Sequence, residues 1–325
     1  RALEYLNQAT QLNPALPDGW IALSELFAKQ GHINQAIENL QTAIQIIPNN
    51  AQLLSKLGEY HLQAGNSTQA ASMLQQAVLL APEAIHNHYL LGIALSRMGR
   101  SSEARDEFGI AYRAEAENIQ YAHAHGTALL IAGDAKSALA PLHFAIQSKT
   151  ITNPSAYVDY AHAVMELYYQ GDTSVLPLSA LESVDYALSL EPNLPEAKAW
   201  RAEALRGIGN FSAALPAYQE ALDTHLPSDR SWRERLTFGM GHTAYQLGRY
   251  DIAIASAQEA ISIAPHNAEN YKLLADAYLH SSLFEGSLRA ARTVLNLNLD
   301  NLTNLAWYAD HVIRLVKQHN ALASP

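Results

Sequence analysis

The sequence predicts an all-α solenoid of antiparallel helix pairs, and three periodic observations lead to this prediction. Glycines recur at intervals of 34 residues, and small residues and prolines recur at the same interval in registers of their own. A fixed period of this length indicates one helical unit that is repeated and stacked, with neighbouring units sharing an extended core. We therefore expect about eight repeats of 34 residues, with a half-repeat at each end of the chain.

The first complete repeat shows how each unit is built. Apolar residues at helical spacing mark a first helix from Trp20 to about Gln30, and Gly31 follows where a left-handed residue would cap it. A second apolar stripe begins at Ala36 and is closed by Pro48, because the residue before a proline avoids the helical conformation. One repeat is therefore a helical hairpin.

Three registers extend this hairpin along the chain. The turn glycine recurs as Gly31, Gly65, Gly99 and Gly133. A small residue in the first helix recurs as Ser24, Gly58, Gly92 and Gly126, and an alanine in the second recurs as Ala36, Ala70, Ala104 and Ala138. A larger side chain in these two slots would hold the helix backbones apart, so we expect the paired helices to make close contact there.

The period slips twice, and the slips divide the chain. An alanine register passes from Ala145 to Ala187 after 42 residues and from Ala221 to Ala260 after 39, which indicates insertions of eight and five residues. We expect a regular array over residues 1–150, a repeat with an insertion over 151–192, three further repeats over 193–300 with an extended helix near 228–236, and a capping or continuing helix over 301–325.

The pattern resembles the tetratricopeptide repeat, in which Trp, Leu, Gly, Tyr, Ala, Phe and Pro occupy fixed offsets. The first repeat meets it with Trp20, Leu23, Phe27, Ala36, Leu40, Ala43 and Pro48, and has Ser24 in place of the glycine. The resemblance covers nearly the whole chain. It implies a right-handed superhelical solenoid whose first helices line a concave groove, and it implies a protein or peptide as the partner that docks there.

The resemblance also assigns residues to the groove. In the first two repeats the groove slots hold Ile21, Glu25, Ser55 and Glu59. The predicted partner-binding residues are Tyr89, Ile93, His123, Thr127, Leu130, Val158, His162, Met165, Phe238 and Tyr245, while Glu203, His242, Lys272 and Asp276 make the C-terminal part mixed. Exposed apolar and aromatic residues often mark interaction sites. The alternative is that these side chains pack across neighbouring first helices.

Some family members hold a C-terminal carboxylate with a clamp of lysine and asparagine in these slots. In this chain Ser55, Tyr89 and His123 stand where the clamp has lysine, so the sequence does not favour a partner of the carboxylate-clamp type.

Composition and charge argue against several other classes of protein. The chain has 31 acidic and 21 basic residues, a net charge of −10 that works against binding to nucleic acid. The one basic and aromatic cluster, "RSWRER" with Arg230, Trp232, Arg233 and Arg235, is interpreted as a solvated helix end. No apolar run is long enough to span a membrane, so no membrane insertion is expected, and no cysteine is present.

Chemical motifs give no catalytic, cofactor or metal site. Gly239, Gly241 and Ala244 fit part of a dinucleotide fingerprint, but no strand is predicted before them. The histidine pairs His86 with His88 and His123 with His125 are two residues apart, a spacing that points side chains in different directions on a helix.

The sequence therefore favours a non-catalytic protein-interaction scaffold. Two alternatives stay open: a regulatory or substrate-recruiting region of a larger enzyme, such as a protease, glycosyltransferase or sulfotransferase, and a periplasmic scaffold for secretion or polysaccharide export. The half-repeats at both ends lead us to expect that the chain continues into further domains. The sequence does not distinguish the cytoplasm from the periplasm.

Overall fold

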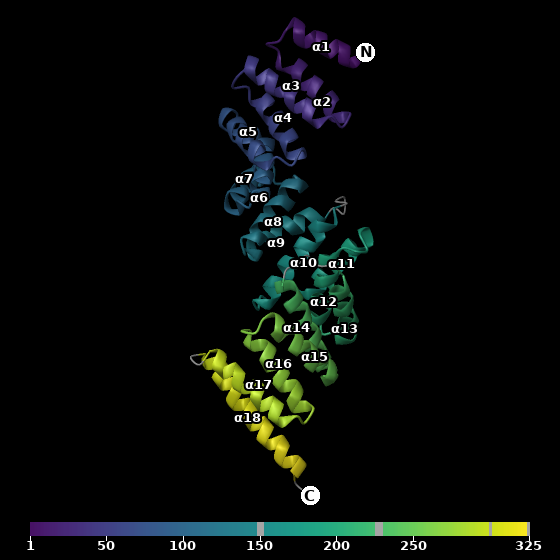
Figure 1. The fold of residues 1–325 in the computed structure, drawn as a ribbon, viewed down its shortest axis with the longest axis vertical. Coiled ribbons are helices and arrows are strands. Elements are labelled where there is room, and N and C mark those ends of the chain that lie inside the picture. The colour runs from purple at the N-terminus through teal and green to yellow at the C-terminus, as the bar shows by residue number, and fades with distance from the viewer. Residues whose placement is uncertain (148–152, 225–229, 299–300, 324–325) are drawn as a thin grey trace. The chain divides into compact units, whose positions relative to one another are not determined.

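The computed structural model describes residues 1–147, 153–224, 230–298 and 301–323, and every regular element in those ranges is a helix. Within each of two parts of the chain, every helix packs against the next one in sequence (Figure 1). They form two compact units, residues 1–149 and residues 150–325, here called unit 1 and unit 2. The all-α fold expected from the sequence is confirmed.

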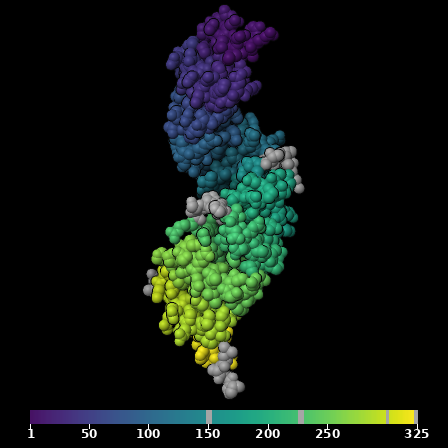
Figure 2. All heavy atoms as spheres, turned by 45° about the vertical axis from the view of Figure 1, so that its right-hand side comes forward, coloured from purple at the N-terminus to yellow at the C-terminus, as the bar shows by residue number. Residues whose placement is uncertain are grey.

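Unit 1 contains a single helix followed by four helical hairpins. Its helices are α1 (Ala2–Leu12), α2 (Pro17–Lys29), α3 (Ile33–Ile46), α4 (Ala51–Gln63), α5 (Ser67–Leu80), α6 (Ile85–Arg97), α7 (Ser101–Ala114), α8 (Ile119–Ile131) and α9 (Ala135–Gln147). Each helix packs against the next one in the chain, and in Figure 2 the repeats follow each other as successive bands of colour.

Unit 2 contains four helical hairpins followed by a single helix. Its helices are α10 (Pro154–Tyr169), α11 (Pro177–Leu190), α12 (Pro195–Gly207), α13 (Phe211–Asp223), α14 (Arg230–Gln246), α15 (Tyr250–Ile263), α16 (Ala268–His280), α17 (Phe284–Leu297) and α18 (Leu302–Ala323). Two first helices are longer than the usual 13 residues: α10 has 16 and α14 has 17. The expected extended helix over 228–236 lies partly outside the described residues.

The turn glycines end the first helices as the sequence predicts. Gly31 has a φ of 80°, and the amide of His32 donates to the carbonyl of Phe27 over 2.9 Å, a backbone hydrogen bond that closes the C-terminal end of the helix. Positive φ angles recur at Gly65, Gly99, Gly133, Gly171, Gly209 and Gly248. In the last hairpin Ser282 adopts this conformation with a φ of 58°.

The small slot permits the close contact between paired helices. A methyl group built on Gly58 would lie 2.5 Å from Cγ of Leu74, and one built on Gly92 would lie 2.6 Å from the Phe108 ring. Both distances are far below normal carbon contacts of about 3.5–4.0 Å. A leucine or phenylalanine of the second helix therefore fills the space that the missing side chain leaves, and this contact fixes the hairpin that presents the first helix.

Candidate functional site

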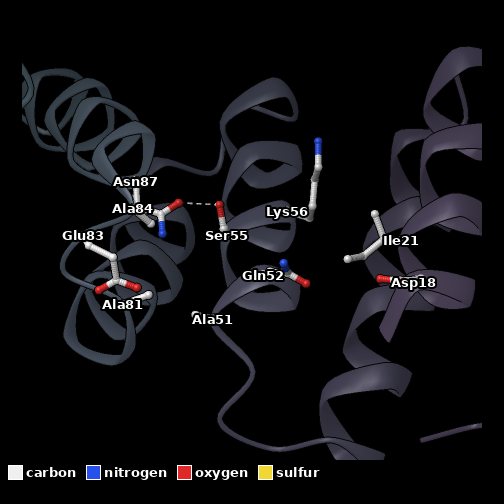
Figure 3. Close-up of a pocket in the computed structure, with 10 residues that line it drawn as sticks. All are labelled: Asp18, Ile21, Ala51, Gln52, Ser55, Lys56, Ala81, Glu83, Ala84 and Asn87. Atoms are coloured by element: carbon white, nitrogen blue, oxygen red, sulfur yellow. Dashed lines mark hydrogen bonds between the residues drawn. The ribbon is translucent and has the colours of Figure 1, made fainter. Parts of the chain in front are cut away.

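The first helices of unit 1 carry an open pocket on one side of the hairpin stack. It has a volume of about 470 Å³ and spans α2, α4 and α6 (Figure 3). Its polar lining consists of Asp18 from α2, Gln52, Ser55 and Lys56 from α4, Glu83 from the turn before α6 and Asn87 from α6. We call this the N-terminal pocket.

The 34-residue period explains why three separate repeats meet in one pocket. Asp18 and Gln52 occupy the same position of the first and second repeats, and Ile21 and Ser55 share another. Because each first helix presents the same face, residues one repeat apart lie next to one another across neighbouring helices. Sequence reasoning placed Ile21 and Ser55 in the groove and missed the other lining residues.

Among the described residues that line the pocket, Lys56 is the only cation, and its charge is already neutralised. Its ammonium lies 3.4 Å from the carboxylate of Glu25 and 3.1 Å from that of Glu59. Burial opposes the charged form, but the hydrogen bond and charge of Glu59, together with Glu25, outweigh it and raise the pKa of Lys56. Lys56 therefore stays protonated and extends away from Asp18 and Glu83 in Figure 3.

Asn87 is a buried polar residue whose side-chain amide nitrogen is not used in a hydrogen bond within the described residues. It is 5% exposed, and its side-chain oxygen accepts a hydrogen bond from the Ser55 hydroxyl over 2.6 Å. Figure 3 shows the amide nitrogen turned away from Ser55 on the pocket side. Within the described residues this nitrogen has no hydrogen-bond partner.

The groove residues predicted in unit 1 are half-buried, and two of them pack on the core. The Tyr89 ring lies 4.9 Å from the Tyr121 ring and 5.9 Å from the Phe108 ring, and burial raises the pKa of Tyr89. Ile93 packs on the same core. The hydroxyl of Thr127 donates to the backbone carbonyl of His123 over 3.0 Å. Leu130, the last predicted residue in this unit, is also half-buried.

The groove residues predicted in unit 2 fall into two groups. Met165 has no exposed surface and Val158 is 7% exposed, so these two side chains offer a partner almost no contact area. His162 is half-buried and stacks on Trp200 with 4.7 Å between ring centroids. Phe238 and Tyr245 are half-buried and pack together against one core cluster.

The interpretation of "RSWRER" as a solvated helix end is wrong for Trp232 and Arg235. Arg235 is only 30% exposed, and its guanidinium lies 4.5 Å from the Trp200 ring centroid and 2.9 Å from the Glu166 carboxylate. Trp232 meets the Trp200 ring edge-on at 5.0 Å. Trp200 of α12 supplies an aromatic surface and Glu166 of α10 supplies a counterion, so both favour an inward position for Arg235 and Trp232.

Arg235 belongs to a buried polar network in unit 2 whose centre is Glu203. The sequence placed Glu203 in the groove, but it has no exposed surface. It accepts hydrogen bonds from the hydroxyls of Tyr169 and Tyr218 and from the guanidinium of Arg206, which lies 2.8 Å away. Although burial opposes ionisation, Arg206 and Arg235 lower the pKa of Glu203. We call these residues the Glu203 network.

The Glu203 network joins three first helices rather than forming a free binding site. Tyr169, Glu203 and Arg235 come from α10, α12 and α14, and a depression of about 270 Å³ lies over them. Burial and the adjacent Glu203 carboxylate raise the pKa of Tyr169 and of Tyr218, so both phenols remain donors. Every charge in the network has an opposite charge beside it, which suits a structural role.

A serine, a histidine and an aspartate in unit 2 have the hydrogen-bonded order of a hydrolase triad. Nε2 of His311 lies 2.8 Å from the Ser287 hydroxyl, and Nδ1 lies 3.0 Å from the carboxylate of Asp276. Ser287 and His311 have no exposed surface, and the serine hydroxyl donates to the carbonyl of Ala275 over 2.9 Å. No substrate reaches such a hydroxyl, and the three residues connect α18 to α16 and α17.

The other chemistry considered from the sequence has ordinary structural partners. His88 lies 2.6 Å from Glu107 and 3.1 Å from the carbonyl of Pro82, and His125 stacks on Tyr112. Among the described residues there is no group of three metal-ligating side chains. No helix in the described part of the chain is long and apolar enough to cross a membrane.

A positional signal for the missed pocket residues was present in the sequence. Asp18, Gln52 and His86 form a 34-residue register at the start of successive first helices, parallel to the register used to assign the groove. Glu83 lies three residues before His86 in the sequence, and Asn87 follows His86 directly. Only the packed repeats reveal which of these side chains are left without a partner.

Family models for tetratricopeptide repeats match several stretches of the sequence. The one described as TPR repeat matches residues 25–65, and the one described as tetratricopeptide repeat matches residues 55–118, 177–236 and 238–296. A search of the curated proteins found no match.

Solved structures share the fold at low sequence identity. A chain in the APC/C hetero-tetramer Cut9–Hcn1 is 15% identical with a TM-score of 0.56, and the match covers 95% of this chain and 58% of that one. This chain therefore spans little more than half the length of that relative. YrrB, described as a TPR protein with an unusual peptide-binding site, is 17% identical with a TM-score of 0.51 and coverages of 60% and 97%. Pseudomonas aeruginosa pilF is 18% identical with a TM-score of 0.52 and coverages of 70% and 97%.

Proposed function

This chain belongs to the tetratricopeptide repeat family, and on that premise we propose that it is a non-catalytic scaffold that binds a peptide segment of a partner protein along its first helices. We call the sides of the first helices that carry the predicted slots the groove face. The observation that carries the proposal is the N-terminal pocket, where three consecutive repeats leave polar groups without partners. Peptide binding at YrrB, a protein of the same fold, is consistent with this use of the repeats.

The half-buried groove residues support the same proposal in a different way. Leu130 and Phe238 retain exposed surface while their backbones are held in first helices. A rigid helix face with partly exposed aliphatic and aromatic side chains binds a partner at low entropic cost, because little has to be ordered on binding. The alternative, packing across neighbouring helices, accounts for Tyr89 and His162, whose rings already contact neighbouring rings.

A pull-down from the native organism tests the proposal. The bait is the chain itself, compared with a groove variant, L130R/F238R, and with a matched control, L79R/L178R. Leu79 and Leu178 are 83% and 49% exposed on the second helices α5 and α11. Far-ultraviolet circular dichroism verifies that each bait is folded.

We expect partners to be recovered with the wild type and the control and to be lost with the groove variant. An arginine in place of Leu130 or Phe238 would have to be buried under the partner, and burial of an unpaired charge is unfavourable. Partners that are lost with L79R/L178R and kept with L130R/F238R would place the interaction on the second helices and refute the proposal. Recovery that is the same with all three baits would refute the involvement of Leu130 and Phe238 in partner binding.

A further inference from the structure

We infer that the N-terminal pocket takes an extended, positively charged peptide segment, with a lysine or arginine side chain held by Asp18 and Glu83 and a peptide carbonyl held by Asn87. This inference rests on the proposed function and specifies the chemistry of the ligand. It depends on three features of the pocket: its charge, its unused hydrogen-bonding groups and its extent across three repeats.

The charge of the pocket is negative and uncompensated. Asp18 and Glu83 line it, and Lys56 is the single cation in the lining. The two ion-pair partners of Lys56, Glu25 and Glu59, add two more carboxylates, which leaves an excess of three negative charges in this group of residues. Lys56 is already paired with Glu25 and Glu59, so it does not neutralise the other two carboxylates. Within the described residues neither Asp18 nor Glu83 has an ion pair or a side-chain hydrogen bond.

Acidic residues near helix N-termini also have a structural role, because they stabilise the helix dipole. Asp18 lies in the first turn of α2, and Glu83 precedes α6 by two residues. Their charge alone therefore does not identify a ligand. The same role is fulfilled by Glu103 and Asp251 in the first turns of α7 and α15, both second helices, which makes these two residues suitable controls.

Asn87 supplies the second and independent observation. Its side chain is buried and its oxygen is fixed by Ser55, so the orientation of the amide is set and the nitrogen is directed to the pocket. The nitrogen is not among the fully buried atoms that lack a partner, so the open pocket leaves it accessible while no group of the described residues pairs with it. A carbonyl oxygen of a bound peptide would satisfy it, which a free cation such as a metal ion or a simple amine would not do.

The dimensions of the pocket agree with a segment of peptide. Its volume of about 470 Å³ lies within the range of about 300–1,000 Å³ that is usual for ligand sites. It is open and crosses three helices, with Glu83 and Asp18 on opposite sides of Gln52 in Figure 3. An extended chain that crosses the helices can therefore present one side chain to a carboxylate while its backbone passes Gln52 and Asn87.

The test uses three fluorescein-labelled decapeptide libraries and the whole chain. The libraries share a degenerate background of Ala, Ser and Leu, and two fixed central residues are lysine in one library, glutamine in the second and glutamate in the third. Affinity is measured by fluorescence anisotropy at low salt and at about 0.5 M salt, where exposed charges are largely screened. The variants are D18N/E83Q, N87A and the matched control E103Q/D251N, each verified by thermal unfolding.

We expect the lysine library to bind about fivefold or more tighter than the glutamine library, as one or two exposed ion pairs allow. This preference should fall to about twofold or less in D18N/E83Q and at high salt, and should persist in E103Q/D251N. N87A should weaken all three libraries alike by about two- to tenfold, since a hydrogen bond to the peptide backbone does not depend on the side chain.

Two results would overturn the inference: no preference for lysine over glutamine, or a preference that D18N/E83Q leaves unchanged. Equal binding of all libraries that N87A does not affect would exclude the backbone contact. If no library binds while the pull-down still yields a partner that depends on the groove face, the cationic peptide is refuted and the scaffold function stands. If neither assay detects binding to the groove face, both proposals fail.

Discussion

Replacing Glu203 with glutamine should destabilise unit 2 more than any exposed charge change in the same unit. Glu203 has no exposed surface and accepts hydrogen bonds from two tyrosine hydroxyls and from Arg206. The substitution keeps the shape of the side chain but replaces an acceptor oxygen by a donor nitrogen. Arg206, which is 19% exposed, then loses its counterion in a site that water barely reaches.

The expected magnitude follows from the cost of breaking a buried ion pair. Removing one partner of such a pair typically costs about 3–5 kcal/mol. For a folded unit of this size each kcal/mol lowers the melting temperature by about 2–4 °C, so E203Q should lower it by about 6–20 °C. E259Q is the matched control, because Glu259 is 45% exposed and pairs with Arg233, which is 68% exposed. That exposed pair should contribute about 0–1 kcal/mol.

Thermal unfolding of the whole chain, followed by circular dichroism, measures both variants. The two units give separate transitions if they unfold independently, and only one transition should move in E203Q. A melting temperature for E203Q that equals that of E259Q would refute the reasoning, because it would mean that the Glu203 network contributes no more than an exposed pair. In that case the depression over these residues would have to be reconsidered as a binding site.

Three further predictions follow from the same structure. Arg206 and Arg235 hold the pKa of Glu203 below its ordinary value of 4.5, against the opposing effect of burial. The contribution of Glu203 to stability should therefore be complete above about pH 4.5 and be lost as the pH falls through the pKa of Glu203 in the folded state. Acid titration of the wild type should show a transition that E203Q lacks. Gly99→Ala should cost about 1–2 kcal/mol in urea unfolding, because its φ is 73° with no atom nearby, while Gly92→Ala should cost about 1–3 kcal/mol through contact with Phe108. S287A should lower the stability of unit 2 by about 1–3 kcal/mol and leave the hydrolysis of p-nitrophenyl acetate unchanged, because its hydroxyl is buried; a loss of hydrolysis would show that the serine is accessible.

The fold was predictable from the sequence because packing in a repeat protein is periodic. Gly58 and Gly92 stand 34 residues apart and face the same kind of second-helix side chain, so one hairpin explains the next. A slot of this kind admits only small residues, such as these glycines or Ser24 in the first repeat, and for this reason the period is visible in a single sequence. The positive φ at Ser282 shows the limit, since the last hairpin uses the same turn without the glycine that signals it.

The site was only partly predictable from the sequence. The position of a residue in the repeat indicates which face of the helix it lies on, but it does not indicate which side chains it contacts. Met165 and Glu203 were assigned to the groove from their positions, yet both are fully buried. Tyr169 of α10 precedes Glu203 by 34 residues, but Arg235 of α14 follows it by 32, so the contacts that enclose Glu203 are only partly in register with the period. Asn87 was missed for the opposite reason, since its free amide depends on where Ser55 of the preceding repeat directs its hydroxyl.

Charge pairing distinguishes the Glu203 network, which is structural, from the N-terminal pocket, which is a candidate ligand site. In the Glu203 network each carboxylate faces a guanidinium, so a partner charge could bind there only by displacing an existing pair and paying for its separation. In the N-terminal pocket Asp18 and Glu83 are exposed and unpaired within the described residues, so a cation gains their attraction without breaking any contact. The difference in free energy favours the N-terminal pocket for a charged partner, even though the Glu203 network contains more charge and more aromatic surface.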